Sequence, residues 1–143
     1  FTDHMPHVRH RKDARRMIES PGWLFDLPVT EGATEGVPEL MEHFDVWVCT
    51  KPLEANPTCR DEKGAWLRRH FPALEDRLII APDKSLIRGS ILLDDAIKPA
   101  WTNRAEWLPV VFTEPFNGAG SEWADWPHWT WADGMDALLA FAP

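Results

Sequence analysis

The sequence predicts an α/β protein in which helices flank a mostly parallel β-sheet. Short runs rich in Val, Ile and Leu alternate with longer helical segments along the chain, a pattern typical of parallel strands joined by crossover helices. Several of these runs end abruptly on polar or charged residues. The length of 143 residues is that of one domain. Together these observations favour a Rossmann-like, three-layer architecture.

Helices are predicted over residues 6–19, 33–43, 60–71 and 134–142. The first is rich in Arg and Lys, and Pro21-Gly22 ends it. Pro38 falls inside the second, where a proline shortens or kinks a helix. The third has the clearest helical pattern, with apolar residues among its charged ones.

Strands are predicted over residues 45–50, 78–81, 90–94 and 108–113. Each is a short run dominated by aliphatic and β-branched residues, as in strands that are covered on both faces. Pro109 favours the start or the edge of its sheet for the last strand. Ligands of parallel sheets bind beyond the carboxyl ends of the strands, so the residues that follow these runs are the first candidates for a site.

The composition excludes several classes of partner. The net charge of −8 opposes binding to a nucleic-acid polymer or an anionic membrane surface. The sequence has neither a secretory leader pattern nor an apolar run long enough to span a membrane. We therefore expect a cytoplasmic protein with a small-molecule partner, and the sequence leaves a homodimer open.

Residue types suited to phosphate and metal binding follow three of the predicted strands. Thr50 ends one strand, Lys84 follows the next, and Asp94 and Asp95 end the third. A Thr hydroxyl can donate to a phosphoryl oxygen, and a Lys ammonium is a compact positive charge. Adjacent carboxylates repel each other, so a divalent cation or a nearby Lys favours keeping both ionised. An Asp-Asp turn or helix N-cap is an equally common reading of that pair alone.

The order and spacing of these residues resemble those of the 5'(3')-deoxyribonucleotidase family of the haloacid dehalogenase (HAD)-like phosphatases. The matching motifs are Val48-Cys49-Thr50-Lys51-Pro52, Asp61-Glu62-Lys63-Gly64-Ala65-Trp66, Asp83-Lys84 and Leu92-Leu93-Asp94-Asp95. The resemblance covers roughly residues 20–140 and implies an HAD-type fold. It also implies that residues 1–28 are a remnant of a cap or helical region and that residues 29–143 are the HAD-like α/β core.

The resemblance implies a 5'-nucleotidase that hydrolyses (deoxy)ribonucleoside monophosphates through an aspartyl-phosphate with Mg²⁺. In that mechanism Asp95 is a metal ligand, with Asp94 beside it as an orienting or water-mediated ligand. Thr50 hydrogen-bonds a phosphoryl oxygen, and Lys84 neutralises developing charge.

The same resemblance suggests residues that contact the substrate. Lys51 stands where the family has a Ser beside the phosphate, so this part of the phosphate pocket departs from the family pattern. Trp23 and Leu24 match positions near the family's apolar base-binding pocket. Lys63 is a helix-surface lysine by default and a phosphate contact only through the resemblance.

One family motif is absent from the sequence. The family's reaction begins on an Asp-x-Asp pair at the end of the first, central strand, and these 143 residues contain no such pair. We therefore expect the sequence to be a fragment without that strand and to be inactive by itself. The alternatives are an HAD phosphatase for another small phosphomonoester and a non-catalytic HAD-like interaction domain.

Overall fold

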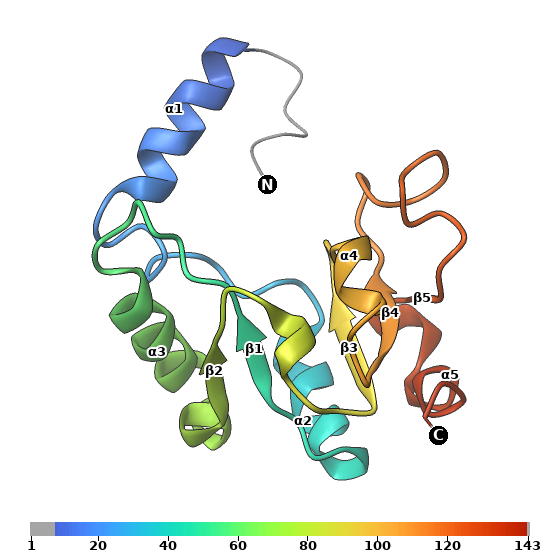
Figure 1. Ribbon diagram of the computed structural model, residues 1–143. Coiled ribbons are helices and arrows are strands. Elements are labelled where there is room, and N and C mark those ends of the chain that lie inside the picture. The colour runs from blue at the N-terminus through green and yellow to red at the C-terminus, as the bar shows by residue number, and fades with distance from the viewer. Residues whose placement is uncertain (1–7, 143) are drawn as a thin grey trace. The chain divides into compact units, whose positions relative to one another are not determined.

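The computed structural model describes residues 8–142 and has the mixed α/β architecture that the sequence predicts (Figure 1). Its strands are β1 (Val48–Thr50), β2 (Leu78–Ile80), β3 (Ile91–Asp94), β4 (Leu108–Phe112) and β5 (His128–Trp129). Its helices are α1 (Val8–Glu19), α2 (Ala33–His43), α3 (Cys59–His70), α4 (Pro99–Thr102) and α5 (Met135–Leu139). Short 3-10 helices are η2 (Pro72–Arg77), η3 (Lys84–Leu86) and η4 (Trp131–Asp133). None of the described helices has the length and hydropathy that crossing a bilayer requires.

The chain divides into two compact units. The first comprises Phe1–Thr34 and Val46–Pro82, and the second comprises Glu35–Asp45 and Asp83–Pro143. Each unit has its own parallel sheet, β1-β2 in the first and β3-β4-β5 in the second. The assignment of residues 1–28 to a cap remnant stays a prediction.

In the first unit a single crossover joins two parallel strands. Val48 pairs with Leu78 and Thr50 with Ile80, and the connection between them contains α3 and η2. A crossover is required because parallel strands cannot be joined by a tight turn. The crossover is anchored by buried apolar side chains, among them Leu67 and Leu74.

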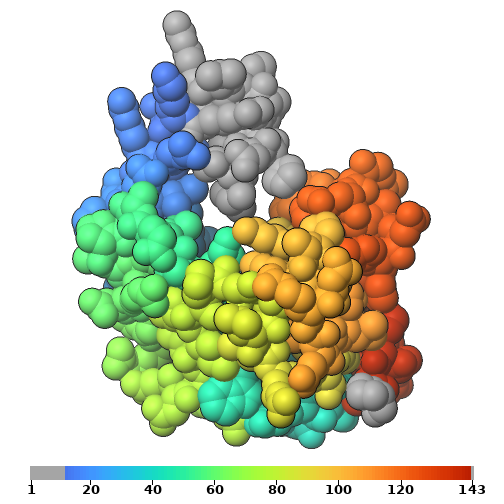
Figure 2. All heavy atoms as spheres, in the orientation of Figure 1, coloured from blue at the N-terminus to red at the C-terminus, as the bar shows by residue number. Residues whose placement is uncertain are grey.

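In the second unit α4 lies in the connection between β3 and β4, and their parallel pairing runs from Ile91 with Leu108 to Asp94 with Val111. Ile97, Trp101 and Trp107 form its buried cluster. The segment 113–127, orange in Figure 2, leads from β4 to β5 without a regular helix or strand. The parallel α/β class that the sequence predicts is therefore confirmed.

Several predicted boundaries differ from the observed ones. The strand predicted over residues 45–50 is observed only as β1, Val48–Thr50. It is shorter because η2 extends to Arg77 and leaves only three residues of β2 to pair with β1. The predicted C-terminal helix begins only after Gly134, whose φ of 76° is not helical. Helix α2 continues through Pro38 over its whole predicted range. Residues 6 and 7 of the predicted basic helix lie outside the described residues.

Strands β1 and β3 are half-buried along their whole length, although they consist mainly of apolar residues. Among the described strands, β1 pairs only with β2, and β3 pairs only with β4. Strands covered on both faces and paired on both edges are usually buried. The absence of a central strand from this sequence stays a prediction.

Aromatic rings pack closely in the second unit. The Trp129 and Trp131 rings lie 5.0 Å apart, and Phe112 contacts both edge-on. Gly36 of α2 packs against the six-membered ring of Trp131, where a Cβ at position 36 would lie 2.8 Å from Cδ2 and overlap with two further ring carbons. Trp129 and Trp131 therefore serve packing.

We expect Gly36→Ala to destabilise the protein by about 1 to 3 kcal/mol in urea unfolding, because the added methyl group forces the Trp131 ring to move. This result is diagnostic because a Gly→Ala substitution inside a helix ordinarily stabilises the folded protein by up to about 1 kcal/mol. Gly64→Ala in α3 is the matched control, since its Cβ would meet only Leu78 Cδ2 at 3.9 Å. Equal effects of the two substitutions would contradict this packing.

Candidate functional site

In the first unit, the carboxyl end of β1 carries a hydroxyl and an ammonium group in contact. Thr50 is the last residue of β1, and its Oγ1 accepts a hydrogen bond from Lys63 Nζ of α3 at 2.7 Å. Lys63 Nζ also donates to the carbonyl oxygen of Lys51. The sequence left Lys63 open between a surface residue and a phosphate contact, and the structure brings it to the strand end.

The Thr50 hydroxyl and the Lys63 ammonium are hydrogen-bond donors of the kind that bind anions. The Thr50 hydroxyl remains able to donate its own proton while it accepts from Lys63, and the ammonium has three donors. A lysine charge and a hydroxyl at a strand end are suited to phosphoryl oxygens. Lys51 contributes its main-chain carbonyl to this arrangement.

Trp23 and Leu24 line different cavities of the first unit. Half-buried Trp23 lines an open cavity of about 650 Å³ together with Ile18 of α1 and Leu53. Leu24, which is buried, lines a second cavity of about 370 Å³ together with Thr50 and Lys63. Both volumes are within the range of small-molecule sites. The second cavity therefore combines an apolar wall with the polar end of β1.

In the second unit, a buried lysine pairs with the carboxylate that ends β3. Lys84 of η3 is 8% exposed and forms an ion pair with Asp94 Oδ2. The Trp107 indole Nε1 donates to the carbonyl oxygen of Lys84 at 3.1 Å. Main chain and side chain of Lys84 are thus both held, which lowers the conformational freedom of the ammonium group.

Asp83 fixes the start of η3 immediately before Lys84. Its Oδ1 accepts hydrogen bonds from the hydroxyl and the amide of Ser85, and its Oδ2 pairs with Arg104 at 2.9 Å. The Ser85 hydroxyl, followed by the Ser85 amide and the Arg104 guanidinium, lowers the pKa of Asp83. An ionised N-cap at this position holds the turn that presents Lys84.

The two adjacent carboxylates at the end of β3 differ in their surroundings. Asp94 has Lys84 as its partner, whereas burial raises the pKa of Asp95 to about 6, with further contributions from the hydrogen bond and the negative charge of Asp94. The Lys84 charge opposes this rise only in part. One positive charge therefore does not compensate two carboxylates here.

The sequence left two other interpretations of Asp94 and Asp95, a turn and a helix N-cap, and the structure tests both. Asp94 Oδ1 accepts a hydrogen bond from the amide of Ala96, at a long 3.4 Å. Helix α4 begins later, at Pro99, with Lys98 as its N-cap. The two carboxylates therefore do not cap that helix, and the turn contact leaves the Asp94–Lys84 ion pair intact.

A fully buried asparagine connects the main chain of Asp95 to the end of β4. Asn117 Nδ2 donates to the carbonyl oxygens of Asp95 at 2.9 Å and Phe112 at 2.8 Å, and its Oδ1 accepts from the amide of Glu114. These bonds from one buried side chain satisfy three main-chain groups. The sequence analysis gave Asn117 no role.

Asp94 and Asp95 suit part of a magnesium site. Mg²⁺ in phosphate-handling sites is usually held by one or two carboxylates, with water and phosphate oxygens as the other ligands. Within the described residues, no group of three or more His, Cys, Asp and Glu side chains could hold a metal ion. The uncompensated charge next to Lys84 is what a divalent cation would neutralise.

The predicted site residues fall into two groups. Trp23, Leu24, Thr50 and Lys51 belong to the first unit, and Lys84, Asp94 and Asp95 to the second. Lys84 and the Asp94–Asp95 pair do come together, as their positions after strands suggest. Sequence reasoning missed Asn117 and the indole of Trp107, whose types and positions give no sign of the main-chain groups that they bind.

Comparisons with known proteins agree with the motifs at the strand ends. The profile of the family described as 5' nucleotidase, deoxy (pyrimidine), cytosolic type C protein (NT5C) matches residues 3–139. A putative 5'(3')-deoxyribonucleotidase of Bordetella pertussis is 32% identical over 131 residues, which are 89% of this chain and 69% of that protein.

Mammalian proteins give shorter matches. The human cytosolic-type 5'(3')-deoxyribonucleotidase is 36% identical over 103 residues, covering 68% of this chain and 50% of that protein. The mouse mitochondrial 5'(3')-deoxyribonucleotidase is 31% identical over 105 residues, covering 69% and 47%. Because the family profile extends over nearly the whole sequence, the chain belongs to the NT5C family of 5'(3')-deoxyribonucleotidases within the HAD-like superfamily.

Proposed function

We propose that this chain carries phosphate-binding and metal-binding groups of a phosphatase that acts on (deoxy)ribonucleoside monophosphates. The observation that carries the proposal is the buried Lys84, paired with Asp94 next to Asp95, at the end of a parallel strand. Family membership supports the same function, since the relatives are named 5'(3')-deoxyribonucleotidases.

The first unit supplies the groups proposed to contact the nucleotide. Thr50 and Lys63 donate to phosphoryl oxygens, and they already contact each other at 2.7 Å. Lys51 adds positive charge close to the same strand end. Trp23 and Leu24 contact the nucleobase through the apolar cavities that they line. Aromatic and aliphatic walls with a few polar groups are typical of such sites.

The second unit supplies the groups proposed to hold the metal. Asp95 binds Mg²⁺, and Asp94 orients the site while it pairs with Lys84. Lys84 stabilises negative charge on the transferring group through an ammonium paired with Asp94, while Trp107 holds the main-chain carbonyl of Lys84. Bound Mg²⁺ would neutralise charge on the phosphate.

The proposed reaction transfers the phosphoryl group first to an Asp carboxylate and then to water. The family's Asp-x-Asp pair, which supplies that carboxylate, does not occur in these 143 residues. The chain as it stands is therefore proposed to bind ligands without turning them over. A cytoplasmic location is part of the proposal, supported by the human relative named cytosolic, although another relative is named mitochondrial. A homodimer stays open.

We expect Asp95→Asn to stabilise the metal-free protein above pH 6 by on the order of 2 kcal/mol. The pKa of Asp95 is raised from 3.8 to about 6 in the folded state. The folded state therefore holds the Asp95 proton over a range where the unfolded state has released it, and stability is lost as pH rises from about 4 to 6. Urea unfolding in EDTA at a series of pH values measures how the free energy of unfolding falls as pH rises. Asp95→Asn should not show this fall.

With Mg²⁺ the wild-type protein should become more stable than Asp95→Asn, which reverses their order without the metal. Mg²⁺ is expected to stabilise the wild-type protein and to leave Asp95→Asn unchanged, because ligands stabilise only the state that binds them. Asp125→Asn, which removes an exposed carboxylate, is the matched control and should respond to Mg²⁺ like the wild type. Equal stabilisation of Asp95→Asn by Mg²⁺ would rule out Asp95 as a ligand.

We expect the chain to bind deoxyuridine monophosphate more tightly than glucose 6-phosphate in isothermal titration calorimetry. Thr50→Val should weaken nucleotide binding about 10-fold or more, because it removes a hydroxyl donor to a charged oxygen while keeping the side-chain volume. Thr34→Val, at an exposed position, is the control. Equal affinity for the two phosphates would favour a different phosphomonoester as substrate.

Phosphate release from deoxyuridine monophosphate by the purified 143-residue chain should be negligible, with or without Mg²⁺, because the sequence contains no Asp-x-Asp pair. A colorimetric phosphate assay measures it. Robust Mg²⁺-dependent release that Asp95→Asn abolishes would require another nucleophile within this sequence.

A further inference from the structure

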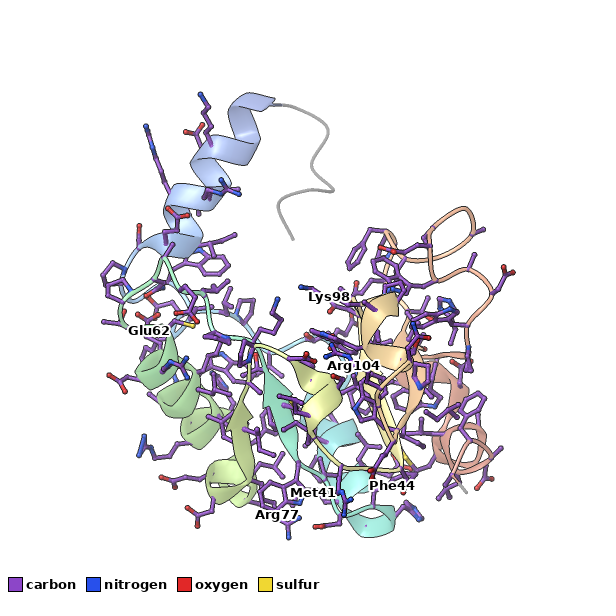
Figure 3. All side chains as sticks on the ribbon, in the orientation of Figure 1. Met41, Phe44, Glu62, Arg77, Lys98 and Arg104 are labelled. Atoms are coloured by element: carbon purple, nitrogen blue, oxygen red, sulfur yellow. The ribbon has the colours of Figure 1, made fainter. Side chains whose placement is uncertain are left out.

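Glu62 is a buried carboxylate that binds main-chain amides of a distant segment. It lies in the first turn of α3 and is 8% exposed. Its Oε1 accepts from the amide of Gly22 at 2.6 Å, and its Oε2 accepts from the amide of Leu24 at 2.9 Å. The amide of Phe25 and the hydroxyl of Thr58 also donate to this carboxylate (Figure 3 labels Glu62).

These hydrogen bonds keep Glu62 ionised. Burial by itself would raise its pKa, but the bonds from Thr58 and from the amides of Gly22, Leu24 and Phe25 outweigh burial and lower the pKa. A carboxylate that accepts several amide hydrogen bonds is stabilised in its charged form. Removal of the charge would leave buried amides without their acceptor.

Two further side chains hold the same segment. Asn56 Nδ2 donates to the carbonyl oxygens of Ile18 at 3.1 Å and Ser20 at 3.2 Å. Trp66 Nε1 donates to the carbonyl oxygen of Leu27 at 2.7 Å. Helix α3 and the turn before it therefore fix the segment 18–27 at three places, with Glu62 in the middle.

The fixed segment lies between the two cavities of the first unit. Trp23 lines the cavity of about 650 Å³, and Leu24 lines the cavity of about 370 Å³ that also contains Thr50 and Lys63. Leu27, Pro28 and Thr30 line both cavities. Glu62 and Lys63 are neighbours on α3. Glu62 holds the segment that separates the cavities, and Lys63 contacts Thr50.

We propose that Glu62 is a positioning residue that sets the nucleoside selectivity of the site by fixing the main chain around Trp23 and Leu24. The inference rests on the proposed function, because it assigns the nucleoside to the cavities that this segment separates. Glu62 itself does not contact the substrate. By binding the main-chain amides of this segment, Glu62 fixes the positions of the Trp23 and Leu24 side chains relative to Thr50, with each side chain in its own cavity.

The test compares nucleotide binding with phosphate binding in a charge-only variant. Glu62→Gln keeps the side-chain volume but replaces one acceptor oxygen by an NH₂ donor, which would face a main-chain amide. Calorimetry on the 143-residue chain is expected to show at least a 10-fold loss of affinity for deoxyuridine monophosphate. Affinity for inorganic phosphate should stay within twofold, since Thr50 and Lys63 keep their contact.

A matched control and a milder variant complete the design. Glu75→Gln removes an exposed carboxylate that pairs with Arg68 at the surface, and both affinities should stay at wild-type values. Thr58→Ala removes one hydrogen-bond donor of Glu62, together with the contact of the same hydroxyl to Asn56 Oδ1 at 3.0 Å, and should cause a smaller loss in the same direction, about threefold. If Glu62→Gln does not fold, Thr58→Ala alone decides the question.

The outcomes separate the inference from the proposed function. Loss of nucleotide affinity without loss of phosphate affinity supports the positioning role. Equal loss of both affinities, or no loss in a folded variant, overturns that role and leaves the proposed function intact. If the wild-type chain binds deoxyuridine monophosphate no better than inorganic phosphate, the proposed function fails and the inference fails with it.

Discussion

Parallel pairing of the strands is the constraint on which the remaining structure depends. Two parallel strands need a crossover between them, and their carboxyl ends then lie at one edge of the sheet. The second unit shows the consequence, because Asp94 ends β3 at the same edge at which Phe112 ends β4. Asn117 can therefore reach the carbonyl oxygens of both Asp95 and Phe112 and join the two strand ends.

Buried polar side chains stabilise the irregular segments next to the candidate site. Lys84, Asn117 and Glu62 are buried, and each forms hydrogen bonds or ion pairs with groups outside its own element. Burial of such groups is costly unless their partners are complete. In each case the partners belong to a loop or a strand end, so the polar contacts order segments that lie outside the regular helices and strands.

One of the groups proposed for the chemistry carries a cost in stability. Burial and the neighbouring Asp94 raise the pKa of Asp95, so an ionised Asp95 destabilises the metal-free protein at neutral pH. Strands β1 and β3, which lead to Thr50 and Asp94, are only half-buried. Binding of a cation or an anion at these strand ends would offset part of that cost by mass action.

The sequence by itself determined the parallel α/β class, the order of its longer helices and of strands β1 to β4, and the polar residues at the strand ends, whereas the short α4 and β5 were not predicted. It could do so because apolar runs, helix periodicity and the residue after each run are local properties of the chain. Only the tertiary structure decided that Glu62 is buried while its neighbour Lys63 reaches Thr50. The Gly22 amide and the carboxylate of Glu62 are 40 residues apart in sequence, so their hydrogen bond depends on packing and has no local signature.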